Sequence, residues 1–185
     1  MVHSGFAFSL TQLIKTSENV GIETFLFFNS GSVLLNQREK LIKSSMEVES
    51  DYTLWLDSDM TFPSTTLLRL LSHEKDIVGC NYLKRSKPVK PVAYTNVGDW
   101  DSWVPMETKD ELVKVEGVGM GCILMKTDLF KQLENIEKLF ADGSIKKAQK
   151  SLRDTLSIVK KEKGVPNKLR HKINFVVAQS RYFDD

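Results

Sequence analysis

Two carboxylates one residue apart, Asp57 and Asp59, have the type and spacing in this chain that most clearly suggest chemistry. They follow the apolar run "YTLWL" and precede a Phe-Pro turn. Side chains two positions apart on a strand point the same way, with Cα atoms about 6–7 Å apart. Such a pair repels and is costly to desolvate unless a cation joins it. Mg²⁺ or Mn²⁺ needs few protein oxygens and keeps positions open for phosphate, so the pair predicts a metal that holds a diphosphate.

The same two carboxylates could serve a different purpose. A calcium-binding EF-hand loop starting at Asp57 would need Gly at its sixth position and Glu at its twelfth, where this chain has Phe62 and Leu68. An EF-hand is therefore excluded. The carboxylates could instead cap a helix opening at Pro63 or organise a turn, and this alternative stays open.

The elements that would position the pair alternate along the first half of the chain. Apolar spacing predicts helices over residues 5–18 and 33–49 and a helix opened by Pro63 and Ser64, with strands over 22–29, 52–57 and 76–83. That order predicts an α/β fold with a mainly parallel sheet and helices on both faces. Ligands of such sheets bind beyond the carboxyl ends of the strands, which is where Asp57 lies.

The second half has a different texture. Residues 84–111 hold three of the five prolines and two of the three tryptophans, which indicates a long irregular loop: a functional lid, or a plain surface excursion with both tryptophans packed back. Residues 112–126 predict a strand pair or one bent strand, and Thr127 and Asp128 can cap a helix to about residue 137. An amphipathic helix is expected over 144–163 and a last strand over 173–178.

The totals describe an ordinary globular chain of 185 residues, 41% hydrophobic and 27% charged, with a net charge of +2. Residues 131–172 carry 12 basic and 5 acidic side chains, which indicates a solvated helix face or, alternatively, contact with nucleic acid or an anionic membrane. Cys80 and Cys122 are expected to be buried reduced thiols. No apolar run has the length of a membrane helix and no signal-peptide pattern opens the chain, so the cytoplasm is the expected compartment.

Three strings together carry a family resemblance: "LWLDSDMTFP", "DIVGCNYLKR" and "VEGVGMGCILMK". With the leucine-rich stretch after the first, they resemble nucleotide-sugar glycosyltransferases of the GT-A fold, especially the compact family-2-like enzymes of large DNA viruses, phages and bacteria. The similarity covers roughly residues 4–133. It implies a single GT-A (Rossmann-like) domain over 1–185, in the host cytoplasm if the chain is viral. Residues 1–83 would form the nucleotide-sugar-binding half, 84–137 the loop and acceptor-side half, and 138–185 a divergent basic helical part.

The resemblance also implies roles for particular residues. Asp57 and Asp59 would hold Mn²⁺ or Mg²⁺ against the donor pyrophosphate, and Ser58 would lie near the donor ribose. Arg38 would stand on the donor side and Arg85 would meet a phosphate, although each could be a surface arginine instead. On the acceptor side, Gly119 and Gly121 would let the backbone approach the sugar. Alternatively, the two glycines only mark a bend in a strand.

The implied reaction transfers a sugar from a UDP- or GDP-sugar to an acceptor hydroxyl of a glycan or protein-linked glycan, without nucleic acid as a partner. The chain departs from the family in two ways: its first strand is apparently missing, and the acidic pair that carries the catalytic base is absent at the usual place. Asp184 and Asp185 could be a remnant of that pair. Other carboxylates near the expected cleft are not ranked: Asp99, Asp101 and Glu116.

Three further functions stay open at this point. The first is a degenerate GT-A domain that binds nucleotide sugar or glycan without turnover, which the two departures favour. The second is a nucleotidyltransferase-like enzyme, for which "NSGS" is a poor phosphate loop. The third is a nucleic-acid binder acting through Lys146–Lys163, whose binding would depend strongly on salt.

Overall fold

The computed structural model describes residues 3–31, 34–96, 104–107, 111–144, 146–147, 149–151 and 172–180, the last of these as a backbone strand. The helices are α1 (Ser4–Asn19), α2 (Leu34–Glu47), α3 (Thr66–Ser72) and α4 (Asp128–Ala141). The strands are β1 (Glu23–Gly31), β2 (Tyr52–Asp57), β3 (Ile77–Gly79), β4 (Ala93–Asn96), β5 (Val104–Pro105), β6 (Gly117–Val118), β7 (Cys122–Lys126) and β8 (Lys172–Ser180).

The larger sheet has five strands in the order β1-β8-β2-β7-β3. β8 pairs in parallel with both β1 and β2, whereas β7 pairs antiparallel with both β2 and β3. β1, β2, β3 and β8 therefore run in one direction and β7 runs against them. The three strands expected in the first half share a direction, but a strand from later in the chain separates each pair of them.

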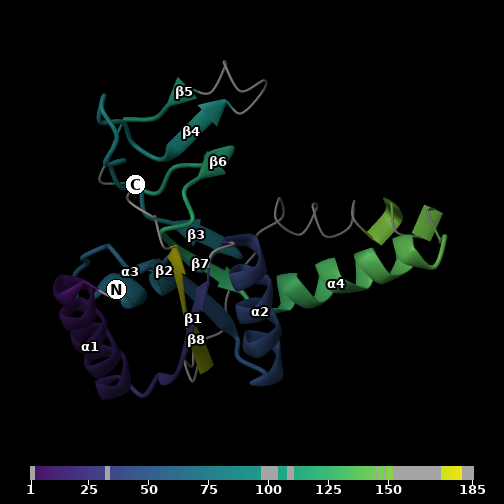
Figure 1. Cartoon of the computed structure of the whole chain (residues 1–185), viewed down its shortest axis with the longest axis horizontal. Coiled ribbons are helices and arrows are strands. Elements are labelled where there is room, and N and C mark those ends of the chain that lie inside the picture. The colour runs from purple at the N-terminus through teal and green to yellow at the C-terminus, as the bar shows by residue number, and fades with distance from the viewer. Residues whose placement is uncertain are drawn as a thin grey trace.

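Helices cover both faces of this sheet (Figure 1). Alternation along β2 divides the core, because Leu54 and Leu56 join one buried cluster and Trp55 joins the other. The first cluster includes Phe6, Leu10 and Leu13 of α1, as their helical spacing predicts, together with Leu67, Leu70 and Leu71 of α3. The second includes Leu41 of α2 and Phe130 of α4. Fully burying side chains of this size contributes about 1.5–3 kcal/mol each, which makes β2 a rigid support for the residues after it.

A second sheet of three short strands, in the order β5-β4-β6, lies beyond one end of the first (Figure 1). The expectation of an irregular segment over 84–111 was therefore wrong in part, since β4 and β5 lie within it. Strands of four and two residues are too short to show alternation in the sequence. The Asn81 side chain ties this region together, since its Oδ1 accepts from the backbone N–H groups of Val92 and Ala93 at 3.1 and 3.0 Å. The two tryptophans of this segment lie outside the described residues.

Several boundaries differ from the sequence-based expectation. α3 begins at Thr66, after a turn that contains Pro63, and β3 is only three residues long. Cys122 is buried as expected, but Cys80 is only half-buried, because it lines a cavity beside α3. Of the basic helix expected over 144–163, the described residues 146–147 and 149–151 are helical and residues 152–163 lie outside the description.

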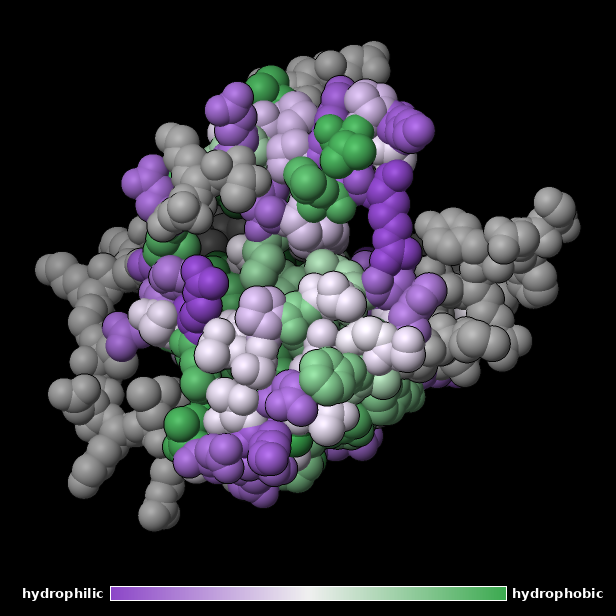
Figure 2. Space-filling view, turned by 90° about the vertical axis from the view of Figure 1, so that its left-hand side faces the viewer, coloured by the Kyte–Doolittle hydropathy of each residue, from purple (hydrophilic) through white to green (hydrophobic). Residues whose placement is uncertain are grey.

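On the side where α1 lies, neutral and apolar side chains occupy much of the middle of the surface, with hydrophilic ones toward its margins (Figure 2). α1 contributes to this apolar surface. Its Phe8 is 68% exposed, whereas its Phe6 is fully buried. Within the part of the chain that the structure describes, no helix combines the length and apolarity needed to cross a bilayer.

Candidate functional site

Asp57 is the last residue of β2, and Asp59 lies in the turn that follows. The predicted strand over 52–57 is confirmed, whereas the strand-like spacing assumed for the pair does not hold, because Asp59 lies beyond the strand. The chain turns because the Met60 N–H donates to the Asp57 carbonyl at 3.2 Å, while the Asp57 N–H donates to the Gly121 carbonyl at 2.9 Å. The backbone thus fixes Asp57 against the segment before β7.

Both carboxylates nevertheless line one cleft, of about 950 Å³. The cleft lies between the turn after β2 and the small sheet, so it opens at the carboxyl end of β2. Its other lining residues are Met60, Thr61, Tyr82, Leu83, Lys84, Arg85, Ser86, Val92, Tyr94, Gly117, Val118 and Gly119. The site therefore combines acidic, basic and aromatic groups in one hollow.

Each carboxylate has an arginine beside it. Arg38 Nη2 lies 4.0 Å from Asp57 Oδ1, and Arg85 Nη1 lies 3.0 Å from Asp59 Oδ2. Arg85 also donates to the Asp59 carbonyl. Burial raises the pKa of Asp57, the Arg38 charge opposes that rise, and the Asp59 charge adds to it. The two carboxylates therefore repel each other across the cleft, an arrangement that favours a bound cation.

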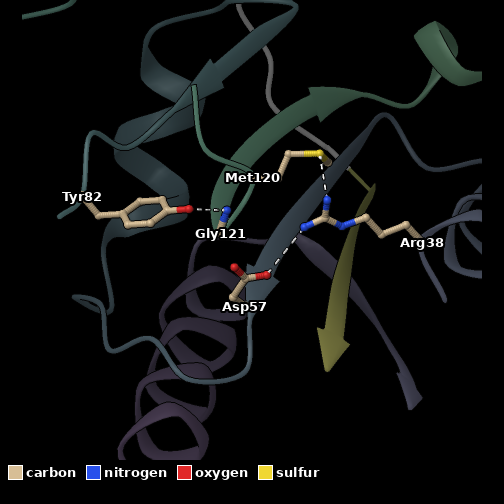
Figure 3. Close-up of polar contacts among 5 residues, drawn as sticks. All are labelled: Arg38, Asp57, Tyr82, Met120 and Gly121. Carbon is tan, nitrogen blue, oxygen red and sulfur yellow. Dashed lines mark hydrogen bonds and ion pairs between the residues drawn. The ribbon is translucent and has the colours of Figure 1, made fainter. Parts of the chain in front are cut away.

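The Arg38 side chain approaches Asp57 from α2 (Figure 3). Its Nη1 donates only weakly, to Met120 Sδ at 3.6 Å, and its buried Nε has no hydrogen-bond partner among the described residues. Buried donors without partners are rare in native proteins. The Arg38 guanidinium, close to Asp57, consequently has an N–H without a hydrogen-bond partner in the part of the chain that the structure describes. The resemblance predicts that this arginine lies near the nucleotide sugar.

Tyr82 is a site residue that sequence reasoning missed. Its Oη accepts a hydrogen bond from the Gly121 N–H at 2.8 Å, across 39 positions of the chain (Figure 3). Gly121 therefore accepts from the Asp57 backbone N–H through its carbonyl and donates to Tyr82 through its own N–H. A tyrosine after a strand gives no sequence signal of such a contact. The glycines of "GVGMGC", which lie beside Tyr82 in space, do give a signal, since close backbone approach is a common reason for glycine.

The two carboxylates suit Mg²⁺ or Mn²⁺ only together with a ligand that brings further oxygens. The described residues contain no group of three or more His, Cys, Asp or Glu side chains placed to hold a metal. Mg²⁺ in phosphate-binding sites is commonly held by one or two carboxylates plus substrate phosphates. Asp57 and Asp59 fit that pattern, provided that Arg85 releases Asp59.

The remaining expected site residues are distributed differently. Ser58 is buried, with 7% of its surface exposed, and does not line the cleft. Gly119 lines it, and Gly121 stands behind it against Tyr82. Glu116 lines a separate cavity beside β3. The other carboxylates considered as bases lie outside the described residues: Asp99, Asp101, Asp184 and Asp185.

Comparison with known proteins gives a similarity over part of the chain. A 77-residue segment is 32% identical to "Mannan polymerase complex subunit mnn9" of Schizosaccharomyces pombe. The match covers 40% of this chain and 21% of that protein, so the matched segment spans about a fifth of that curated relative. No protein-family profile matches the chain, and no solved structure matches it. The similarity connects the chain with a glycosylation-related protein.

Proposed function

We propose that this chain is a metal-dependent glycosyltransferase of the GT-A fold that moves a sugar from a nucleoside diphosphate sugar to an acceptor hydroxyl of a glycan or protein-linked glycan. The observation that carries the proposal is the pairing of Asp57 and Asp59 in one cleft at the carboxyl end of β2, with Arg38 and Arg85 beside them. The similarity to a mannan polymerase subunit supports a mannosyl donor, and GDP-mannose is the first candidate.

Asp57 and Asp59 would hold Mn²⁺ or Mg²⁺ together with the donor diphosphate. When bound, this ion supplies positive charge that stabilises the departing diphosphate. Arg38 would donate to a phosphate oxygen from Nη2, which lies 4.0 Å from Asp57 Oδ1, because an arginine fork matches phosphate geometry. Arg85 would exchange the Asp59 carboxylate for phosphate as the ligand enters.

Binding of a nucleotide sugar without turnover is the second candidate. It is favoured by the position of Glu116, the one described residue among the carboxylates considered as a base, which lines a different cavity from Asp57. An inverting transferase needs a carboxylate within hydrogen-bond reach of the acceptor hydroxyl. A hydrolysis and transfer assay on GDP-mannose separates this candidate from the enzyme.

Calorimetric titration of GDP and UDP, with and without Mn²⁺, tests the donor site. We expect binding that requires the metal and that weakens at least tenfold in Asp59→Asn, since loss of the charge removes half of the protein's metal ligands. Asp142→Asn is the matched control, because Asp142 is exposed at the end of α4 and does not line the cleft.

Two results would contradict the proposal. Equal binding in the presence of Mn²⁺ and of a chelator would argue against the metal. No binding of either nucleotide or of GDP-mannose under any condition would remove the donor site altogether.

A further inference from the structure

The Tyr82 hydroxyl occupies a space that two glycines leave open. A Cβ atom added to Gly119 would lie 2.6 Å from Tyr82 Oη, and one added to Gly121 would lie 2.5 Å from the same atom. Real Cβ atoms essentially never approach so closely. The hydroxyl is thus enclosed by backbone on two sides, and the Gly121 N–H fixes its oxygen at 2.8 Å.

The Tyr82 hydroxyl proton is left for a ligand. The bond from Gly121 uses the oxygen as an acceptor, so the O–H can still donate, and it has no acceptor among the described residues. Burial raises the pKa of Tyr82 above its ordinary value, although the hydrogen bond from Gly121 opposes the rise. The phenol therefore keeps its proton at neutral pH and acts as a neutral donor.

The surroundings of Tyr82 differ from those of Asp57 and Asp59. The arginines meet the carboxylates, and in Figure 3 Arg38 and Tyr82 lie on opposite sides of Asp57. The residues that lie closest around the Tyr82 hydroxyl are neutral, namely Val92, Gly119 and Gly121, while Lys84 lies farther along the cleft over the Tyr94 ring. A diphosphate fits the charged part, whereas a neutral hydroxyl beside aromatic and backbone groups suits a sugar ring.

We propose that Tyr82 is a sugar-recognition residue whose O–H donates to a hydroxyl oxygen of the transferred sugar, an inference that rests on the proposed glycosyltransferase function. Gly121 holds this donor in fixed relation to the Asp57 backbone, because its N–H bonds Tyr82 and its carbonyl accepts from the Asp57 N–H. The sugar is thereby oriented with respect to the diphosphate, and Gly119 and Gly121 serve the site by admitting the hydroxyl.

Tyr82→Phe tests the inference with Mn²⁺, GDP and GDP-mannose. We expect the Kd for GDP-mannose to rise about 5- to 30-fold, as for loss of one buried hydrogen bond, while the Kd for GDP changes less than twofold. Tyr52→Phe, at the opposite end of β2, should change neither. Unchanged affinity for GDP-mannose would overturn the inference, and so would equal losses for both ligands, since the contact would then not be with the sugar.

Deoxy analogues of GDP-mannose provide a second test that uses the wild-type chain. One analogue should bind the wild type about 5- to 30-fold more weakly than GDP-mannose and show no further loss in Tyr82→Phe, because both changes remove the same contact. If no analogue weakens wild-type binding, the inference is wrong. Failure of the proposed function looks different: the wild type would bind neither GDP nor GDP-mannose, and the inference would fall with it.

Discussion

At the scale of single residues, the arrangement of charge in the cleft is more informative than the pair of carboxylates alone. Asp59 and Arg85 are 45% and 66% exposed, and ion pairs at that exposure contribute only about 0–1 kcal/mol to folding. Arg38 keeps a buried Nε without a partner among the described residues, which costs stability. Neither arginine is placed well for stabilising the fold, and Arg85, which lines the cleft, is placed well for binding an anion.

Arg85→Gln separates these two roles. We expect the free energy of unfolding to change by less than about 1 kcal/mol, whereas the Kd for GDP with Mn²⁺ should rise about tenfold. Urea denaturation and calorimetry measure the two effects. Lys43→Gln is the matched control, since it removes the cation of another exposed ion pair, with Glu39. A loss of stability without a loss of binding would assign Arg85 to the fold.

Gly121→Ala tests the close packing around Tyr82. The new Cβ would meet Tyr82 Oη at 2.5 Å and Met60 Sδ at 2.8 Å, so the ring has to move away from the Gly121 N–H. We expect a destabilisation of about 1–3 kcal/mol by urea denaturation, together with weaker binding of GDP-mannose. In Gly31→Ala the nearest atom lies at 3.4 Å, so this control should cost less. Similar effects of both changes would contradict the packing argument.

At the scale of elements, buried hydroxyl groups join the start of β2 to the end of β7. Thr127 Oγ1 lies 2.9 Å from Thr53 Oγ1 and 3.0 Å from Ser50 Oγ, and all three residues are buried. The Thr127 N–H also donates to the Asp51 carbonyl at 3.0 Å. Thr127 was expected to cap α4, but its side chain instead connects two strands of the sheet.

Thr127→Val measures that connection. The change keeps the shape but leaves two buried hydroxyl groups without this partner, so we expect a loss of about 1–3 kcal/mol in the free energy of unfolding. In the control Thr11→Val, the lost bond is an exposed one to the Ala7 carbonyl within α1, and the effect should stay within about 0.5 kcal/mol. Equal effects would show that the hydroxyl network adds little to the sheet.

Cys80 and Cys122 bring β3 and β7 together, with their Sγ atoms 3.5 Å apart. The bond from the Cys122 thiol, and more weakly the Arg69 charge, lower the pKa of Cys80, whereas the same bond and burial raise the pKa of Cys122. Iodoacetamide should therefore modify Cys80 in the folded protein and reach Cys122 only after denaturation. Mass spectrometry after timed labelling measures this order, and equal native rates at the two thiols would contradict it.

At the scale of the whole molecule, the sequence predicts local elements well and their neighbours poorly. The spacing of apolar residues predicts α1, α2 and β2. The residues on either side of Asp57 and Asp59 predict that this pair belongs to a site, and both line the cleft. Pairing between distant segments has no local signal, so neither the position of β8 between β1 and β2 nor the contact of Tyr82 with Gly121 could be predicted. The strand-like spacing assumed for Asp57 and Asp59 did not hold, because a turn hydrogen bond directs the chain after Asp57.

Val176→Pro tests the central position of β8, on which the five-stranded sheet depends. Val176 is paired with Phe27 of β1 and Trp55 of β2, so a proline there removes a ladder N–H in the interior of the sheet. We expect a loss of about 3 kcal/mol or more, seen by circular dichroism as a lower melting temperature or no cooperative transition. Val176→Ile keeps the N–H and the β-branched shape and should remain folded. Wild-type stability of Val176→Pro would show that β8 is not needed between β1 and β2, and that the two strands find another arrangement.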